Sequence, residues 1–291
     1  MDQFNRRDFI TRGLVGVGSV WVGLNQSLLQ ASTSTKKLAS DQVLLGSTGI
    51  KLSRLALGSG TNGVNHSSEQ TRLGVKTFSD LLRYGFDQGI NFWETADQYG
   101  SHPHLNAGLK QVGRNRVVLL TKTHAGTSDE MWADLDRFRK ELGTDFIDVV
   151  LLHCMMSANW PQERQGAMEV LSKAKEKGII RAHGVSCHTL EALKVAAKNP
   201  WVQVDLARIN PIQAHMDSDP ATVISVLQEM KKNGKGVIGM KILGAGQLTH
   251  DVKRAIEHAV KLDCVDAFTI GFSRKEHLDE VVQKMPQFSA V

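Results

Sequence analysis

The feature that most constrains the fold is the regular alternation of strand-like and helix-like segments. Short apolar runs rich in β-branched residues occur eight times, at residues 54–58, 90–94, 117–121, 147–153, 180–186, 204–209, 236–242 and 266–271. Helical patterns follow them at 75–88, 104–112, 128–142, 162–177, 190–198, 221–232, 252–262 and 274–284. Strands that alternate with crossover helices predict a parallel sheet.

Eight such units predict a closed (β/α)8 TIM barrel, an α/β fold in which each strand is followed by a helix. An open doubly wound sheet usually carries a GxGxxG turn after its first strand, whereas this chain reads LGSGTNG there. Before the first barrel strand, VLLGSTGIKLS predicts a β-hairpin that turns at Ser47–Gly49. We therefore expect residues 42–291 to form one barrel with an N-terminal β-hairpin.

The N-terminal segment has the layout of an export signal. Arg6 and Arg7 precede Phe9 in NRRDFIT, and a glycine-rich, weakly apolar stretch follows at residues 13–24. The arginine pair resembles a twin-arginine signal, which directs proteins that are already folded in the cytoplasm. We expect a signal at 1–31, a linker at 32–41, the twin-arginine export machinery as a partner and a periplasmic location.

Charge and cysteine content argue against a nucleic-acid-binding protein, a disulfide-rich protein and a cysteine-based metal site. The formal net charge is +5, and residues 1–37 hold five Lys or Arg against two Asp, so +3 lies there and +2 in the rest. The body therefore lacks the clustered cations that a nucleic-acid surface needs. Cys154, Cys187 and Cys264 are far apart and form no CxxC pair, so they match neither a disulfide framework nor a metal-ligand set.

Ionisable residues stand where the predicted strands end. Glu94 ends the second run, Tyr99 follows five residues later, Lys122 follows the third run and His153 ends the fourth. The carboxyl ends of barrel strands meet at one face, so these side chains should converge. There, an ammonium lowers the pKa of a tyrosine, a carboxylate holds the ammonium, and a histidine orients a carbonyl oxygen. The set suits proton transfer to a carbonyl, with hydride from a nicotinamide cofactor.

Five motifs extend this interpretation: FWETADQYG, LLTKTH, DVVLLH, GVSCH and IGFSRKEHLDE. Their order and spacing resemble the aldo-keto reductase family over residues 42–291. The resemblance implies that Tyr99 is the general acid, assisted by Lys122, Glu94 and His153, and that the substrate is a small carbonyl compound or alcohol. Glu94 stands where the family has aspartate, and Asp97 falls at a variable position.

The resemblance also implies a cofactor, NADP with NAD as the alternative. The residues that it assigns to cofactor binding are Ser186, Cys187, Lys241, Gly271, Ser273, Arg274 and Glu280. An arginine beside a helix N-terminus suits a 2′-phosphate. Cys187 replaces an asparagine of the family, and Met240 replaces its stacking aromatic ring.

Other functions stay open at this point. The sequence departs from the family pattern at the catalytic carboxylate and at the positions that bind the nicotinamide. The chain could therefore be a non-catalytic protein that binds or senses a nicotinamide or another ligand. Lys241 could instead form a Schiff base, as barrel aldolases do. His102 and His104 form a His-x-His pair, but they follow the second strand rather than lying on the first, so we expect no metal. Neither the substrate nor the oligomeric state is predicted.

Overall fold

The computed structural model describes residues 36–288. The predicted signal at 1–31 lies outside them, so it stays a prediction. Residues 36–41, which we assigned to the linker, already pack on the barrel: Ala39 is 3% exposed, and its carbonyl accepts a hydrogen bond from the Leu55 amide at 3.0 Å. Within the described range, no helix is both long and apolar enough to cross a membrane.

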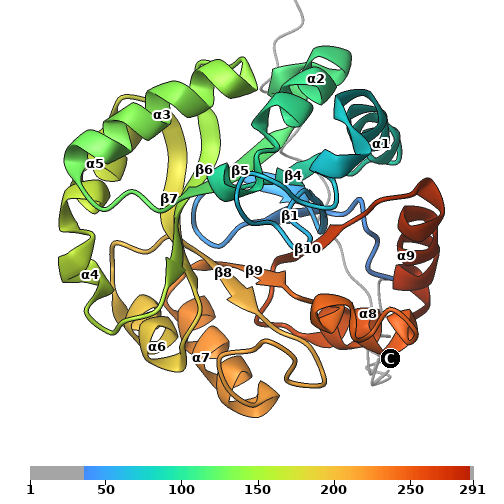
Figure 1. Ribbon diagram of the computed structural model, residues 1–291. Coiled ribbons are helices and arrows are strands. Elements are labelled where there is room, and N and C mark those ends of the chain that lie inside the picture. Colours follow the sequence, from blue (N-terminus) through green and yellow to red (C-terminus); the bar gives the residue numbers. More distant parts are fainter. Residues whose placement is uncertain (1–35, 289–291) are drawn as a thin grey trace, which may run out of the picture. The chain divides into compact units, whose positions relative to one another are not determined.

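Eight parallel strands close into a barrel (Figure 1). The order around it is β10-β3-β4-β5-β6-β7-β8-β9, so chain neighbours are also neighbours in space. The strands are β3 (Leu55–Gly58), β4 (Phe92–Glu94), β5 (Val118–Thr123), β6 (Ile147–Met155), β7 (Ile180–Cys187), β8 (Val204–Arg208), β9 (Gly236–Met240) and β10 (Ala267–Gly271). The barrel predicted from the alternation is confirmed.

Helices form a ring around these strands (Figure 1). They are α1 (Val75–Asp87), α2 (His102–Val112), α3 (Ser128–Leu142), α4 (Trp160–Glu163), α5 (Gln165–Glu176), α6 (Leu190–Lys198), α7 (Pro220–Lys232), α8 (Val252–Lys261) and α9 (Lys275–Phe288). The helix predicted at 162–177 is wrong as a single element, because the backbone of Arg164 leaves helical geometry between α4 and α5, with φ −114° and ψ 13°. Helix α2 starts two residues earlier than predicted, with Pro103 in its first turn, where its fixed φ suits a helix start.

The two-residue period of the strands sorts side chains between two cores. In β5, Leu120 faces the barrel interior, and Leu119 faces the helices. Lys122 shares the parity of Leu120, just as His153 shares that of Leu151 in β6. The same alternation that packs the barrel therefore turns these ionisable side chains inward near the carboxyl ends of their strands.

A hairpin closes the opposite end of the barrel. It consists of β1 (Gln42–Leu44) and β2 (Lys51–Ser53), and Leu45, Ile50 and Leu52 are fully buried with the interior side chains. Gly46 lies so close to the start of β9 that a Cβ there would overlap the backbone nitrogen of Gly236. The predicted hairpin is confirmed, and it leaves only the carboxyl end of the strands for a site.

Candidate active site

A buried ion pair lies at the centre of the site. Glu94 and Lys122 are 5% and 1% exposed, and the Lys122 ammonium donates to Glu94 Oε1 and, at 2.8 Å, to the carbonyl of Thr95. Thr269 of β10 donates to Glu94 Oε2 at 3.1 Å. Burial lowers the pKa of Lys122, and the charge of Glu94 opposes that shift. The glutamate thus reaches the lysine, despite having one methylene more than the aspartate of the family.

Tyr99 packs beside this pair. It ends a 3₁₀ helix, Asp97–Tyr99, and its ring centroid lies 4.8 Å from the Lys122 Nζ. A Cβ at Gly60 or Gly63 would overlap ring atoms of Tyr99, so the loop after β3 needs glycine at both positions to admit the ring. We expected the lysine to lower the pKa of Tyr99, but burial, followed by the charge of Glu94, raises that pKa well above its ordinary value. The phenol is therefore held protonated.

His153 completes the cluster. Its ring meets the Tyr99 ring edge to face, with centroids 5.8 Å apart, and stacks on His124 at 4.6 Å. Burial and then the charge of Lys122 lower the pKa of His153 well below its ordinary value. The imidazole is therefore neutral and can hydrogen-bond an oxygen without protonating it. The four residues that we predicted as catalytic come from three neighbouring strands and one turn, and the fold brings them together.

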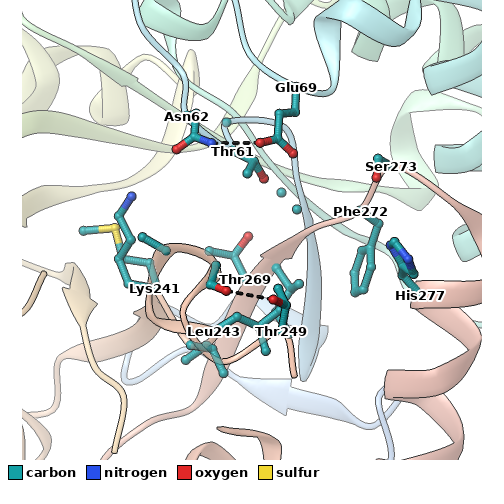
Figure 2. A pocket seen from close by; sticks show the side chains of 18 of the residues that line it. Thr61, Asn62, Glu69, Lys241, Leu243, Thr249, Thr269, Phe272, Ser273 and His277 are labelled. Atoms are coloured by element: carbon teal, nitrogen blue, oxygen red, sulfur yellow. Dashed lines mark hydrogen bonds between the residues drawn. The ribbon is translucent and has the colours of Figure 1, made fainter. Parts of the chain in front are cut away.

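A cavity of about 410 Å³ opens beside Glu94 and Tyr99 and extends to the start of α9 (Figure 2). Pockets that hold small molecules usually measure about 300–1,000 Å³. Its walls come from the loop after β3, the segment after β9, the end of β10 and the first turns of α9. Of the predicted cofactor residues, the following line it: Lys241, Gly271, Ser273 and Glu280.

Lys241 points into this cavity (Figure 2). It follows β9 directly in a left-handed conformation, with φ 60°. Burial lowers its pKa, and the charge of Glu94 raises it in part. Among residues 36–288 its ammonium has neither a hydrogen bond nor an ion pair. A cation with free donors in a cavity suits a phosphate or a carboxylate.

Three predicted cofactor residues lie elsewhere. Arg274 lines a smaller adjoining cleft together with Lys76 and Lys275. Ser186 is fully buried, and its Oγ accepts a hydrogen bond from the Cys154 amide at 3.0 Å. Cys187 has the opposite strand parity, so it is buried among side chains of the helix layer rather than in the cavity. The cavity and its cleft offer Ser273 and four cations, of which Lys76 is paired with Asp80 of the same cleft. The other three cations and Ser273 fit the phosphates of a dinucleotide.

Sequence reasoning missed three contributors to the site. Thr269 was hidden in the apolar run DAFTIG, although a polar residue at an inward position of a barrel strand is a usable signal. The glycines that admit the Tyr99 ring, Gly60 and Gly63, carry no local signal, since any loop can contain glycine.

Comparisons with known proteins agree with this geometry. The family model described as "Aldo/keto reductase family" matches residues 55–285. L-galactose dehydrogenase of Arabidopsis thaliana is 27% identical over 70% of this chain and 66% of its own length. Aldo-keto reductase YhdN of Bacillus subtilis is 30% identical over 51% of this chain and 47% of its own length. The chain thus spans about half to two thirds of these relatives. A structure of aldo-keto reductase AKR11C1 from Bacillus halodurans, solved in its holo form, superposes with a TM-score of 0.69 at 15% identity, covering 86% of this chain and 96% of that one.

Proposed function

The chain belongs to the aldo/keto reductase family, and from that premise we propose that it is an NADP(H)-dependent oxidoreductase that interconverts carbonyl compounds and alcohols. The observation that carries the proposal is the buried Glu94–Lys122 pair beside the ring of Tyr99, at the end of a cavity that Lys241 enters. Both features serve a carbonyl reductase: one supplies a proton, and the other holds a phosphorylated cofactor.

The residues divide the work of reduction as follows. NADPH, when bound, supplies the hydride. Tyr99 donates its phenolic proton to the carbonyl oxygen, and Lys122 stabilises the phenolate that this leaves. Glu94 and Thr269 fix the ammonium of Lys122 in place. Neutral His153, next to Tyr99, donates a hydrogen bond that orients the carbonyl oxygen. In the oxidation direction, the same phenolate accepts the proton of the alcohol.

A preference for NADP over NAD is supported by the cations at the start of α9. Arg274 and Lys275 line the cleft that adjoins Ser273, where a 2′-phosphate would find both cations as donors. Lys76 lines the same cleft but is paired with Asp80 at 2.6 Å. The measurement is the affinity ratio for NADPH and NADH, by fluorescence titration of the purified protein. Arg274→Met should bring that ratio toward one, and an unchanged ratio would contradict the assignment of Arg274.

The main test is turnover. The purified protein should oxidise NADPH when it is offered a panel of aldehydes and ketones, and Tyr99→Phe should lower the rate by about 10²–10⁴-fold while NADPH affinity stays the same. Wild-type protein that binds NADPH without turning over any carbonyl would favour the non-catalytic alternative. A Tyr99→Phe variant as active as wild type would refute the assigned acid.

We extend this proposal to residues 1–31, which act as a twin-arginine signal that exports the folded protein to the periplasm. Support comes from the Arg6-Arg7 pair and the weakly apolar stretch after it. The test is cell fractionation of the wild type and of a variant with both arginines replaced by lysine. Wild type should be in the periplasmic fraction and the variant in the cytoplasm; equal distributions would exclude this route.

A further inference from the structure

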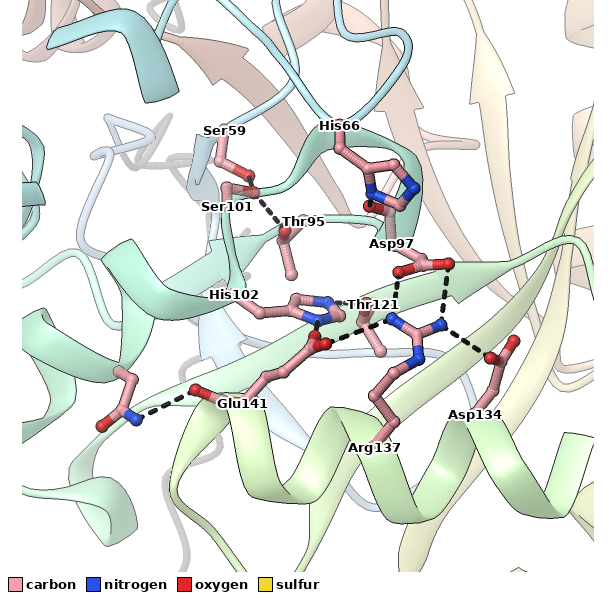
Figure 3. Close-up of polar contacts among 11 residues, drawn as sticks. Ser59, His66, Thr95, Asp97, Ser101, His102, Thr121, Asp134, Arg137 and Glu141 are labelled. Carbon is pink, nitrogen blue, oxygen red and sulfur yellow. Dashed lines mark hydrogen bonds and ion pairs between the residues drawn. The ribbon is translucent and has the colours of Figure 1, made fainter. Parts of the chain in front are cut away.

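The turn that carries Tyr99 is fastened to a distant helix. Asp97 starts the 3₁₀ helix that Tyr99 ends, and the Arg137 guanidinium of α3 donates to both of its carboxylate oxygens, at 2.6 and 2.9 Å (Figure 3). Paired, parallel hydrogen bonds of this kind fix direction as well as distance. Arg137 therefore sets where this turn lies relative to α3.

Arg137 is also bonded within its own helix. It donates to Asp134 at 2.7 Å and to Glu141 at 3.2 Å, so three carboxylates share one guanidinium (Figure 3). The bonds to Asp97, and then the bond to Asp134, raise the pKa of Arg137, which stays charged throughout. The bonds to Asp134 and Glu141 lie within α3 and could stabilise that helix alone. The two bonds to Asp97 instead connect α3 to the 3₁₀ helix that carries Tyr99.

The same network reaches the strand that carries Lys122. Thr123 donates to the second oxygen of Asp134. On the other side, Glu141 lies 2.7 Å from His102 Nδ1, and His102 Nε2 lies 2.8 Å from the Thr121 hydroxyl (Figure 3). Thr121 and Thr123 flank Lys122 in β5 and face outward where Lys122 faces inward. Polar contacts thus join Arg137 to the side chains on both sides of Lys122.

A metal site is the competing interpretation of this cluster. Ligand atoms of Asp97, His102 and Glu141 lie within 4.8 Å of one another. However, Arg137 already donates to both carboxylates, and Thr121 takes the remaining nitrogen of His102. A cation there would have to displace a guanidinium that is held by four hydrogen bonds.

We propose that Arg137 is a positioning residue, which holds the turn of Tyr99 and the strand of Lys122 at the separation that proton transfer requires. This inference rests on the proposed function. It assigns a role to Asp97 as well, which the family resemblance places at a variable position. Arg137 touches neither substrate nor cofactor in this role and acts through the positions of Tyr99 and Lys122.

Kinetics supply the first test. Arg137→Ala should lower kcat for NADPH-dependent reduction of 4-nitrobenzaldehyde by about 10- to 100-fold, the loss typical of a misplacement near 1 Å, with NADPH affinity unchanged. Arg137→Lys should recover only part of kcat, because an ammonium cannot form the paired bonds. Arg139→Ala is the matched control: Arg139 lies on α3 and pairs with Asp136 in the same helix. Equal kcat in the Arg137→Ala and Arg139→Ala variants would overturn the proposal.

A second variant guards against misfolding of the first. Asp97→Asn keeps the size of the side chain and removes its charge. If both residues act through one contact, the double variant should lose no more activity than the worse single variant. Independent, multiplying losses would overturn the proposal.

Tyrosine NMR tests the same idea without any turnover. The chain has two tyrosines, and Tyr84 bonds Asp279 at 2.9 Å, away from this network. With ¹³Cζ-labelled tyrosine, Arg137→Ala should shift the Tyr99 signal and make it titrate at lower pH than in wild type, while Tyr84 and the Arg139→Ala spectrum stay unchanged. An unmoved Tyr99 signal would overturn the positioning role. Wild-type protein that reduces no carbonyl would instead refute the proposed function, and the spectrum would still decide this inference.

Discussion

Replacing Glu94 by glutamine isolates the counter-charge of a buried lysine. Glutamine keeps the length of the side chain and its contact with Thr269, but leaves the Lys122 ammonium, 1% exposed, without an opposite charge. Breaking a buried ion pair at one partner costs about 3–5 kcal/mol. Lys122 can escape part of this cost by losing its proton. At pH 7 that release costs at most about 4.6 kcal/mol, from an ordinary lysine pKa of about 10.4.

The two estimates agree, so we expect Glu94→Gln to lower stability by about 3–5 kcal/mol at pH 7. For a barrel of this size, that corresponds to a fall in Tm of roughly 6–20 °C. The pH dependence follows from the sign of the shift. In the variant, the pKa of Lys122 is lower in the folded than in the unfolded protein, so the penalty is full at low pH and fades as pH rises toward the unfolded value. At pH 9.4 it should not exceed about 1.4 kcal/mol.

The assay is thermal unfolding of wild type and variant at pH 7 and 9.4, with NADPH oxidation as a second readout. Glu94→Gln combined with Lys122→Met also removes the unpaired ammonium of Lys122. This double variant should recover most of the stability that Glu94→Gln loses at pH 7. Asp80→Asn is the exposed control: its partner Lys76 is 89% exposed, so the loss of stability should be much smaller than that of Glu94→Gln. A Glu94→Gln variant as stable as wild type at pH 7, or a penalty that does not shrink at pH 9.4, would refute the reasoning.

Three further changes test other parts of the site. Gly60→Ala should cut the reduction rate at least about 10-fold with little change in NADPH affinity, because its Cβ would overlap the Tyr99 ring; wild-type activity would show that the ring can shift freely. Lys241→Met should weaken NADPH binding about 10-fold or more by titration, and borohydride with a carbonyl substrate should leave no adduct on wild-type Lys241; a trapped adduct would point to Schiff-base chemistry. Burial raises the pKa of Asp205 to about 8, so above the pKa of the unfolded chain its tendency to ionise costs the folded protein stability. Asp205→Asn should therefore raise the free energy of unfolding by an amount that grows from pH 4 to pH 8, up to about 6 kcal/mol. A difference in Tm between variant and wild type that stays constant with pH would contradict this.

Periodicity and order in the sequence were enough to predict the barrel and much of the site. The period of two in VVLLTK and DVVLLH fixes which side chains face inward, and the strand order makes Glu94, Lys122 and His153 neighbours. The same period could have shown that Cys187, one residue beyond inward-facing Ser186, faces the helices. The prediction that Cys187 binds the cofactor relied on its position in a family motif and not on strand geometry.

Other features depend on contacts that no local pattern encodes. Arg137 and Asp97 are 40 residues apart, and in the sequence each has the pattern of an ordinary charged surface residue. The pKa of Tyr99 is set by how completely the surrounding loops bury it, so the lysine beside it could not decide the direction. Arg164 interrupts a helix through its backbone conformation, although its neighbours are good helix formers.

The hairpin closes one end of the barrel, so the start of the described chain and the opening for ligands lie at opposite ends. Lys37 reaches the carbonyl of Val260, near the end of α8, so the described chain enters beside the sealed end. Cofactor and substrate must come and go through the opposite mouth. A carrier protein or a solid support joined directly at residue 36 would therefore be attached on the side away from that mouth.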